Sequence, residues 1–186
     1  MLIDITLKIT SEMAQNSGHD GRKELVGHIG THFDVMHKEF PLEYTQRKGI
    51  IFDVRNVKNR DIELSDIDIS RVEKNTFVAF CTEFIEKEGY GKGVYFSEHP
   101  QLSDELIGAL LDSGVSIIGV DFAGIRRGKE HIPKDRYCAE RGTFVIENLC
   151  NLASLLKFGA FTAHTYPMSY VGLTGLPCRV IAETVN

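Results

Sequence analysis

The chain has 186 residues, which is the size of one domain with a substantial core, so we expect a single domain over 1–186. Apolar residues make up 42% and charged residues 25%, as in an ordinary globular chain, and no apolar run reaches the ~18 residues that a membrane span needs. The net charge of −5, without a run of basic residues, disfavours nucleic acid as a partner because phosphate binding needs clustered Lys and Arg. We therefore expect neither membrane nor nucleic acid as a partner.

The first residues, MLIDITLKIT, alternate apolar and polar side chains and include Asp4. This pattern is typical of a first strand and not of a signal peptide. Four cysteines, at positions 81, 138, 150 and 178, share no C-x-x-C spacing, so they do not indicate a zinc ribbon or a redox pair. We expect buried free thiols and a cytoplasmic protein.

Strands are predicted where β-branched and apolar residues gather between turn signals, at 2–9, 26–35, 49–57, 75–84, 115–122, 143–149 and 177–185. A helix is predicted to follow the N-cap Ser103 and to end at Gly114, because ELIGALLDSG repeats apolar residues at spacings of three and four. A second helix is predicted from Pro133 toward Glu140 or Arg141. This alternation of strands and helices predicts the α/β class.

Between residues 27 and 40, the stretch GHIGTHFDVMHKEF contains three histidines and one aspartate. In an extended chain, His28, His32 and Asp34 point to one face. A straight strand would separate positions 28 and 32 by ~13 Å, too far for one ion, so a metal site requires a bend, and Gly30 lies at the midpoint. Histidine and carboxylate together suit zinc or manganese. The alternative is a solvated polar strand face.

The motif HIGTHFD resembles the HxGTHxD signature of the cyclase-like metal-dependent hydrolases, the family of bacterial kynurenine formamidases and isatin hydrolases. Over about residues 2–183, further blocks resemble family patterns in the same order: IDIT, FPLEYTQRKGIIFDVR, HPQLSDELIGALLDSGVSIIGVD, RGTFVIENLCNL and PMSYVGLTGLPCRVIA. The resemblance implies the family's swivelling β/β/α fold and a homodimer or larger assembly. It also implies four metal ligands, His28, His32, Asp34 and Glu147.

Two departures from the family pattern concern the chemistry. The pattern continues D-x-P-x-H, with a histidine that acts as general acid or base, but here Met36 replaces the proline, His37 comes one residue early and Lys38 holds the formal position. We predict His37 as the catalytic proton-transfer residue, since deletion of the proline would bring it there. A structural or exposed His37 is the alternative, because strict strand alternation would turn it away from the face of Asp34.

The second departure is the family's later metal histidine, twelve residues before the glutamate, where this chain has Asp135. An aspartate has a shorter reach and adds negative charge, which puts a second ion in doubt. His131 replaces the histidine only if the loop before Pro133 folds inward.

The resemblance and the ligand set predict a metal-dependent hydrolase that acts on an amide, formamide or lactam bond of a small-molecule substrate, with kynurenine formamidase as the nearest named activity. Residues 13–27 contain no aromatic side chain, so the sequence does not itself predict an aromatic substrate. Two alternatives stay open: a non-catalytic metal- or ligand-binding member of the fold, and a cyclase or dehydratase that uses the same metal.

Overall fold

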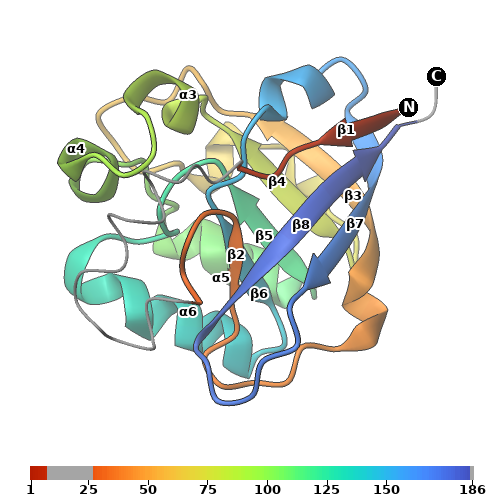
Figure 1. Ribbon diagram of the computed structural model, residues 1–186. Coiled ribbons are helices and arrows are strands. Elements are labelled where there is room, and N and C mark those ends of the chain that lie inside the picture. The colour runs from red at the N-terminus through yellow and green to blue at the C-terminus, as the bar shows by residue number, and fades with distance from the viewer. Residues whose placement is uncertain (8–26, 185–186) are drawn as a thin grey trace.

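The structure is a computed structural model that describes residues 1–7 and 27–184 (Figure 1). The outer parts of three predicted strands (8–9, 26 and 185) and most of the polar segment 13–27 lie outside the described residues. In the part of the chain that the structure describes, no helix is both long and apolar enough to cross a membrane.

The described strands form one mixed sheet with the order β1-β8-β2-β6-β5-β4-β3-β7, and a further pairing of β7 with β8 closes it into a barrel. Strands β3 to β6 run parallel to one another, whereas β1, β2, β7 and β8 pair in antiparallel fashion. The bounds are β1 Leu2–Asp4, β2 His32–Asp34, β3 Gln46–Asp53, β4 Phe77–Cys81, β5 Ile117–Val120, β6 Phe144–Glu147, β7 Ala160–Pro167 and β8 Gly175–Glu183.

The helices lie outside the barrel (Figure 1). They are α3 Phe84–Glu88, α4 Gly93–Ser97, α5 Asp104–Asp112 and α6 His131–Glu140, with short 3-10 turns at Leu42–Thr45, Leu64–Asp66, Ile69–Arg71, Gly128–Glu130 and Leu152–Leu155. Helix α5 begins as predicted, because the Ser103 hydroxyl accepts a hydrogen bond from the Leu106 amide at 3.1 Å. The predicted α/β class is confirmed.

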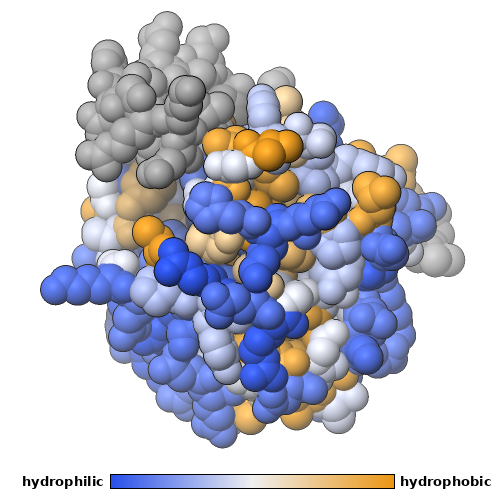
Figure 2. Space-filling view, turned by 90° about the horizontal axis from the view of Figure 1, so that it is seen from below, coloured by the Kyte–Doolittle hydropathy of each residue, from blue (hydrophilic) through white to orange (hydrophobic). Residues whose placement is uncertain are grey.

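Two apolar cores lie on opposite faces of the sheet because neighbouring strand residues point to opposite sides. On β4, Phe77 and Ala79 belong to the core inside the barrel, whereas Val78 and Phe80 belong to the core beneath α5. Because both faces of the sheet are covered, strands β4, β5 and β6 are almost continuously apolar, as expected for parallel strands. The surface seen from below is mainly hydrophilic, with apolar side chains in separate patches (Figure 2).

The structure corrects several of the predicted elements. Residues 27–31 form turns and bends and only His32–Asp34 is a strand, so the predicted strand over 26–35 is wrong for most of its described length. Strand β7 has no counterpart among the predicted strands, because its inward side chains include the small Ala163 and the polar Thr165, which do not give an apolar strand pattern. Helices α3 and α4 have five residues each, too few to show a helical period.

Candidate metal centre

The ladder between β2 and β6 places three ligand-type side chains on the outer face of the barrel. His32 pairs directly with Glu147, and Phe33 pairs with Ile146. Phe33 and Ile146 belong to the interior core, so His32, Asp34 and Glu147 point the other way, toward α6. In Figure 1, β2 lies between β8 and β6, with α6 beside them.

The first group of donor atoms comes from the turn before β2 and from β2 itself. His28 Nδ1 lies 3.1 Å from His32 Nε2 and 3.1 Å from Asp34 Oδ1, and His32 Nε2 lies 3.6 Å from Asp34 Oδ1. Atoms that share one ion at bonds of ~2.1 Å lie about 3 to 3.5 Å apart, so this spacing is what a common metal ion requires. The bend expected at Gly30 is present, with φ of 65°, and it brings His28 back over His32.

Hydrogen bonds on the far side of each ring orient both histidines. His32 Nδ1 lies 2.8 Å from the Gly30 carbonyl oxygen, to which it donates, so Nε2 keeps its lone pair for the cluster. His28 uses the opposite nitrogen, because its Nε2 lies 2.9 Å from the Thr174 hydroxyl and its Nδ1 faces the cluster. Such partners fix the ring orientation that a metal ligand needs.

A buried polar chain holds the Gly30 carbonyl in place. Asn148 donates to that oxygen from Nδ2 at 2.9 Å, and the Tyr95 hydroxyl donates to Asn148 Oδ1 at 2.6 Å. The Gly30 amide in turn donates to the Tyr90 hydroxyl at 2.9 Å. Sequence reasoning did not identify these supporting residues, because their role depends on contacts between distant segments.

The second group of donor atoms comes from β6 and α6. His131 Nε2 lies 2.8 Å from Glu147 Oε1 and 3.1 Å from Asp135 Oδ2. His131 and Asp135 are four residues apart on α6, which places them on the same face one turn apart. The helix begins at His131, two residues before the predicted start. The His131 ring points toward Glu147 and Asp135, which is the condition under which it could replace the family histidine.

The six side chains bring three carboxyl groups and three imidazole rings into one cluster. Asp34, Asp135 and Glu147 are all buried. Burial would lower the pKa of His32, but the nearby charges of Asp34 and Glu147 raise it to about 9. Burial and the charge of Asp34 raise the pKa of Asp135 and of Glu147 well above the usual value for a carboxyl. A bound cation would offset this repulsion.

Two of these carboxylates have no hydrogen-bond partner among the described residues. Both side-chain oxygens of Asp34 and both of Asp135 are buried without such a bond, although His28 and His131 approach them within 3.1 Å. Buried carboxylate oxygens without partners are costly and call for a compensating group. Histidine and carboxylate donors at this spacing therefore fit a divalent metal ion.

Glycines border the cluster at points of close approach. A Cβ on Gly124, whose φ is 108°, would lie 2.9 Å from His131 Nε2 and 3.0 Å from Glu147 Oε1. A Cβ on Gly175 would lie 2.8 Å from the His28 ring and 2.7 Å from the Gly27 carbonyl oxygen. Both sites lack room for a side chain because the donor atoms and the neighbouring backbone occupy it.

The structure brings together the four predicted ligands and places His37 differently. His37 and Lys38 are exposed, and His37 has a φ of 68° in the turn that follows β2. Neither residue belongs to the two groups of donor atoms found among the described residues. The role of His37 in proton transfer stays a prediction.

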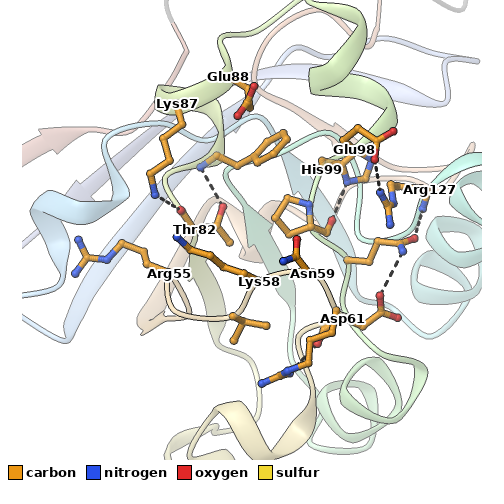
Figure 3. A pocket seen from close by; sticks show the side chains of 15 residues that line it. Arg55, Lys58, Asn59, Asp61, Thr82, Lys87, Glu88, Glu98, His99 and Arg127 are labelled. Atoms are coloured by element: carbon orange, nitrogen blue, oxygen red, sulfur yellow. Dashed lines mark hydrogen bonds and ion pairs between the residues drawn. The ribbon is translucent and has the colours of Figure 1, made fainter.

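A separate pocket of about 620 Å³ has mostly charged and polar walls (Figure 3). His99 lines it and stacks on Phe122 with ring centroids 5.7 Å apart, and burial lowers the pKa of His99 to about 4. None of the six side chains of the cluster lines this pocket. The segment after Phe122 borders both sites, since Gly124 adjoins His131 and Arg127 lines the pocket.

The fold and the cluster agree with comparisons to known proteins. A family model described as "Putative cyclase" matches residues 3–126, which is more than half of the chain. The chain therefore belongs to this cyclase family, as the sequence motifs predicted. No curated protein gives a significant match.

Solved structures of low sequence identity share the fold over almost the whole chain. A potential metal-dependent hydrolase with cyclase activity covers 98% of each chain with a TM-score of 0.75 at 22% identity. A predicted metal-dependent hydrolase from Bacillus stearothermophilus covers 98% of this chain and 97% of its own, with a TM-score of 0.74 at 21% identity. Isatin hydrolase A from Labrenzia aggregata, bound to benzyl benzoate, covers 100% and 94%, with a TM-score of 0.74 at 18% identity.

Proposed function

We propose that this protein is a metal-dependent hydrolase that cleaves an amide, formamide or lactam bond of a small-molecule substrate. The observation that carries the proposal is the convergence of His28, His32, Asp34 and Glu147, with the Asp34 carboxylate buried and lacking a hydrogen-bond partner among the described residues. Two of the similar structures are described as metal-dependent hydrolases and a third is an isatin hydrolase, which supports hydrolysis as the reaction.

A divalent ion at this site would supply a Lewis acid that polarises the scissile carbonyl and lowers the pKa of water to about 7. His28 and His32 would hold it through the nitrogens that face the cluster, and Asp34 through a carboxylate oxygen. The Gly30 carbonyl and the Thr174 hydroxyl keep the two rings in place at 2.8 and 2.9 Å. We propose zinc or manganese, because both accept mixed nitrogen and oxygen donors.

Cleavage of an amide also requires a proton for the leaving nitrogen, and we propose His37 as its donor. His37 is exposed and follows Asp34 by three residues, so its ring can exchange protons with solvent. Kynurenine formamidase remains the nearest named activity in this proposal. A cytoplasmic homodimer or larger assembly is the proposed form of the protein.

The metal is tested by removing one ligand. Purified protein should bind at least one zinc or manganese ion per chain, and His32→Ala should weaken that binding by ~10-fold or more, because a direct ligand matters at least as much as its supporting residues. Elemental analysis and calorimetric titration measure both quantities. His164→Ala serves as the matched control, since this ring bonds to Glu183 at 2.9 Å on other strands. Absence of bound metal at saturation would refute the proposal.

The proton donor is tested by comparing two neighbouring substitutions. His37→Ala should keep the metal but lose ~10²-fold to 10⁴-fold in turnover, the usual contribution of general acid–base catalysis. Lys38→Ala should have a much smaller effect. A large loss at Lys38 with normal turnover in His37→Ala would assign the role to Lys38.

A screen of formamides, lactams and lactones with metal-loaded protein identifies the substrate for these assays. The exposed position of His37 favours one second candidate, a metal- or ligand-binding member of the fold without catalysis. Metal binding without turnover of any of these compounds would support that candidate over the hydrolase.

A further inference from the structure

The pocket of Figure 3 lies at the carboxyl ends of the parallel strands β3, β4 and β5. Its walls come from the segments that follow these strands, namely residues 55–61, 82–88 and Arg127, together with 98–101 before α5. The carboxyl ends of parallel strands are a common place for ligand sites in α/β proteins. No side chain of the metal cluster lines the pocket, so a ligand held there would not need the metal.

The charges on the walls favour an anion. Five of the fifteen lining residues are basic and three are acidic, whereas the whole chain has 21 basic and 26 acidic residues. Four of the five basic side chains lie within 3.6 Å of a carboxylate oxygen. Lys58 is the fifth, and its ammonium group has no ion pair among the described residues. This ammonium group is therefore available to an anionic ligand.

His99 supplies a hydrogen-bond acceptor on the wall. Its side chain is buried, and Nδ1 donates to the Pro100 carbonyl oxygen at 2.8 Å. Since burial lowers the pKa of His99 to about 4, the ring is neutral at pH 7 and Nε2 carries a lone pair. Nothing among the described residues donates to Nε2, and this atom is not sealed inside the protein. A donor on a ligand would satisfy it.

Other uncharged side chains on the walls already have partners. The Thr82 hydroxyl donates to Asp121, and the Gln101 amide oxygen accepts from the Arg127 amide at 2.8 Å. Lys58 and His99 therefore remain as the groups that a ligand would contact. Figure 3 shows them on different sides of the pocket, so one ligand must carry a negative charge and, apart from it, a hydrogen-bond donor.

We propose that this pocket binds a small hydroxylated anion, whose carboxylate or phosphate group contacts the Lys58 ammonium and whose hydroxyl donates to His99 Nε2. The volume of about 620 Å³ falls within the range of ~300 to 1,000 Å³ that is usual for small-molecule sites. The inference goes beyond the proposed function, because it uses neither the metal nor the hydrolytic reaction.

The experiment compares two probes that differ only in a hydroxyl group. Metal-loaded protein is titrated with lactate and with propionate, and calorimetry measures the two dissociation constants. Lactate should bind about 5-fold more tightly, because its hydroxyl adds one hydrogen bond between neutral groups. A third titration, with glycerol 3-phosphate, distinguishes the two kinds of anion: tighter binding than lactate assigns a phosphate ligand, and weaker binding assigns a carboxylate.

Substitutions separate the two contacts. Lys58→Ala should weaken both acids by about 10-fold, the loss of one charge-assisted hydrogen bond. His99→Phe keeps a ring against Phe122 and should make lactate bind as weakly as propionate. Lys157→Ala, a change of an exposed lysine outside the pocket, is the matched control and should bind both acids normally. His32→Ala should also bind them normally, because the pocket does not include the metal ligands.

Four outcomes overturn the inference: no binding of any probe at millimolar concentration, equal affinities of the wild type for lactate and propionate, unchanged affinities in Lys58→Ala, or loss of lactate binding in His32→Ala. The last result would place lactate on the metal. Lys58 is exposed, so its substitution provides the test even where His99→Phe fails to fold. Failure of the proposed function is distinguishable, because turnover does not enter these measurements.

Discussion

Gly30 determines the ligand geometry of the metal centre through its backbone conformation. Its φ of 65° is rarely adopted by residues with a side chain, and its carbonyl oxygen accepts from both His32 and Asn148. We predict that Gly30→Val weakens metal binding by ~10-fold or more, because a branched side chain disfavours this conformation by about 1 to 3 kcal/mol and releases the hydrogen bond that orients His32.

The control for Gly30→Val separates backbone strain from loss of the site. Gly91 has a φ of 90°, and no atom of the described residues lies within 4 Å of the position that a Cβ would occupy there. Gly91→Val should therefore destabilise the protein to thermal unfolding but leave metal affinity unchanged. Normal metal binding by Gly30→Val would show that the bend does not set the ligand geometry.

At the scale of the element, the segment that follows β5 lies close to one residue of α6 and one residue of β6. Gly124 in this segment adjoins both His131 and Glu147, at 2.9 and 3.0 Å from a Cβ placed there. We predict that Gly124→Ala displaces His131 and Glu147 and lowers the affinity for Mn²⁺ by ~10-fold or more, because Glu147 is one of the four predicted ligands. Calorimetric titration with Mn²⁺ measures this affinity.

Gly128→Ala is the matched control for this segment. Gly128 also has a positive φ, 59°, but the described part of the chain places nothing within 4 Å of its Cβ position. Gly128→Ala should lose some stability through backbone strain and bind Mn²⁺ normally. Equal effects of the two substitutions on Mn²⁺ affinity would mean that strain in the segment, and not contact with His131 and Glu147, is responsible.

At the scale of the whole molecule, Asp121 makes stability depend on pH. Its carboxylate is fully buried after β5 and accepts hydrogen bonds from the Thr82 amide at 2.8 Å and the Glu83 amide at 2.7 Å. Burial raises the pKa of Asp121 to about 7, since these bonds and the Thr82 hydroxyl only partly offset the loss of solvation, and the charge of Glu86 adds to the rise.

The sign of the effect follows from proton binding. The folded protein holds this proton more tightly than the unfolded chain, in which the pKa of an aspartate is 3.8. Between pH 3.8 and about 7, the contribution of Asp121 to the free energy of unfolding therefore falls as pH rises, by up to about 4 kcal/mol. Asp121→Asn should remove this dependence, as measured by urea unfolding across this pH range. An unchanged difference in stability between pH 4 and pH 7 would contradict the prediction.

The chemistry of the first group of donor atoms could be predicted from the sequence, because its three residues are close together in the chain. HIGTHFD contains His28, His32 and Asp34 within seven residues, and the need for a bend at Gly30 follows from strand geometry alone. The cores of β4 to β6 and the N-cap of α5 could be predicted for the same reason, since an apolar run and a capping serine are local signals.

The other features of the fold and of the site were decided only by the tertiary structure, because they depend on contacts between segments far apart in the sequence. His131 becomes part of the cluster only because α6 packs over β2 and β6, and no local pattern requires its inward position. Strand β7 exists because β3 and β8 pair with its backbone, although its side chains give a weak strand signal. The polar chain from Tyr95 through Asn148 to Gly30 likewise depends on hydrogen bonds made only after the barrel has closed.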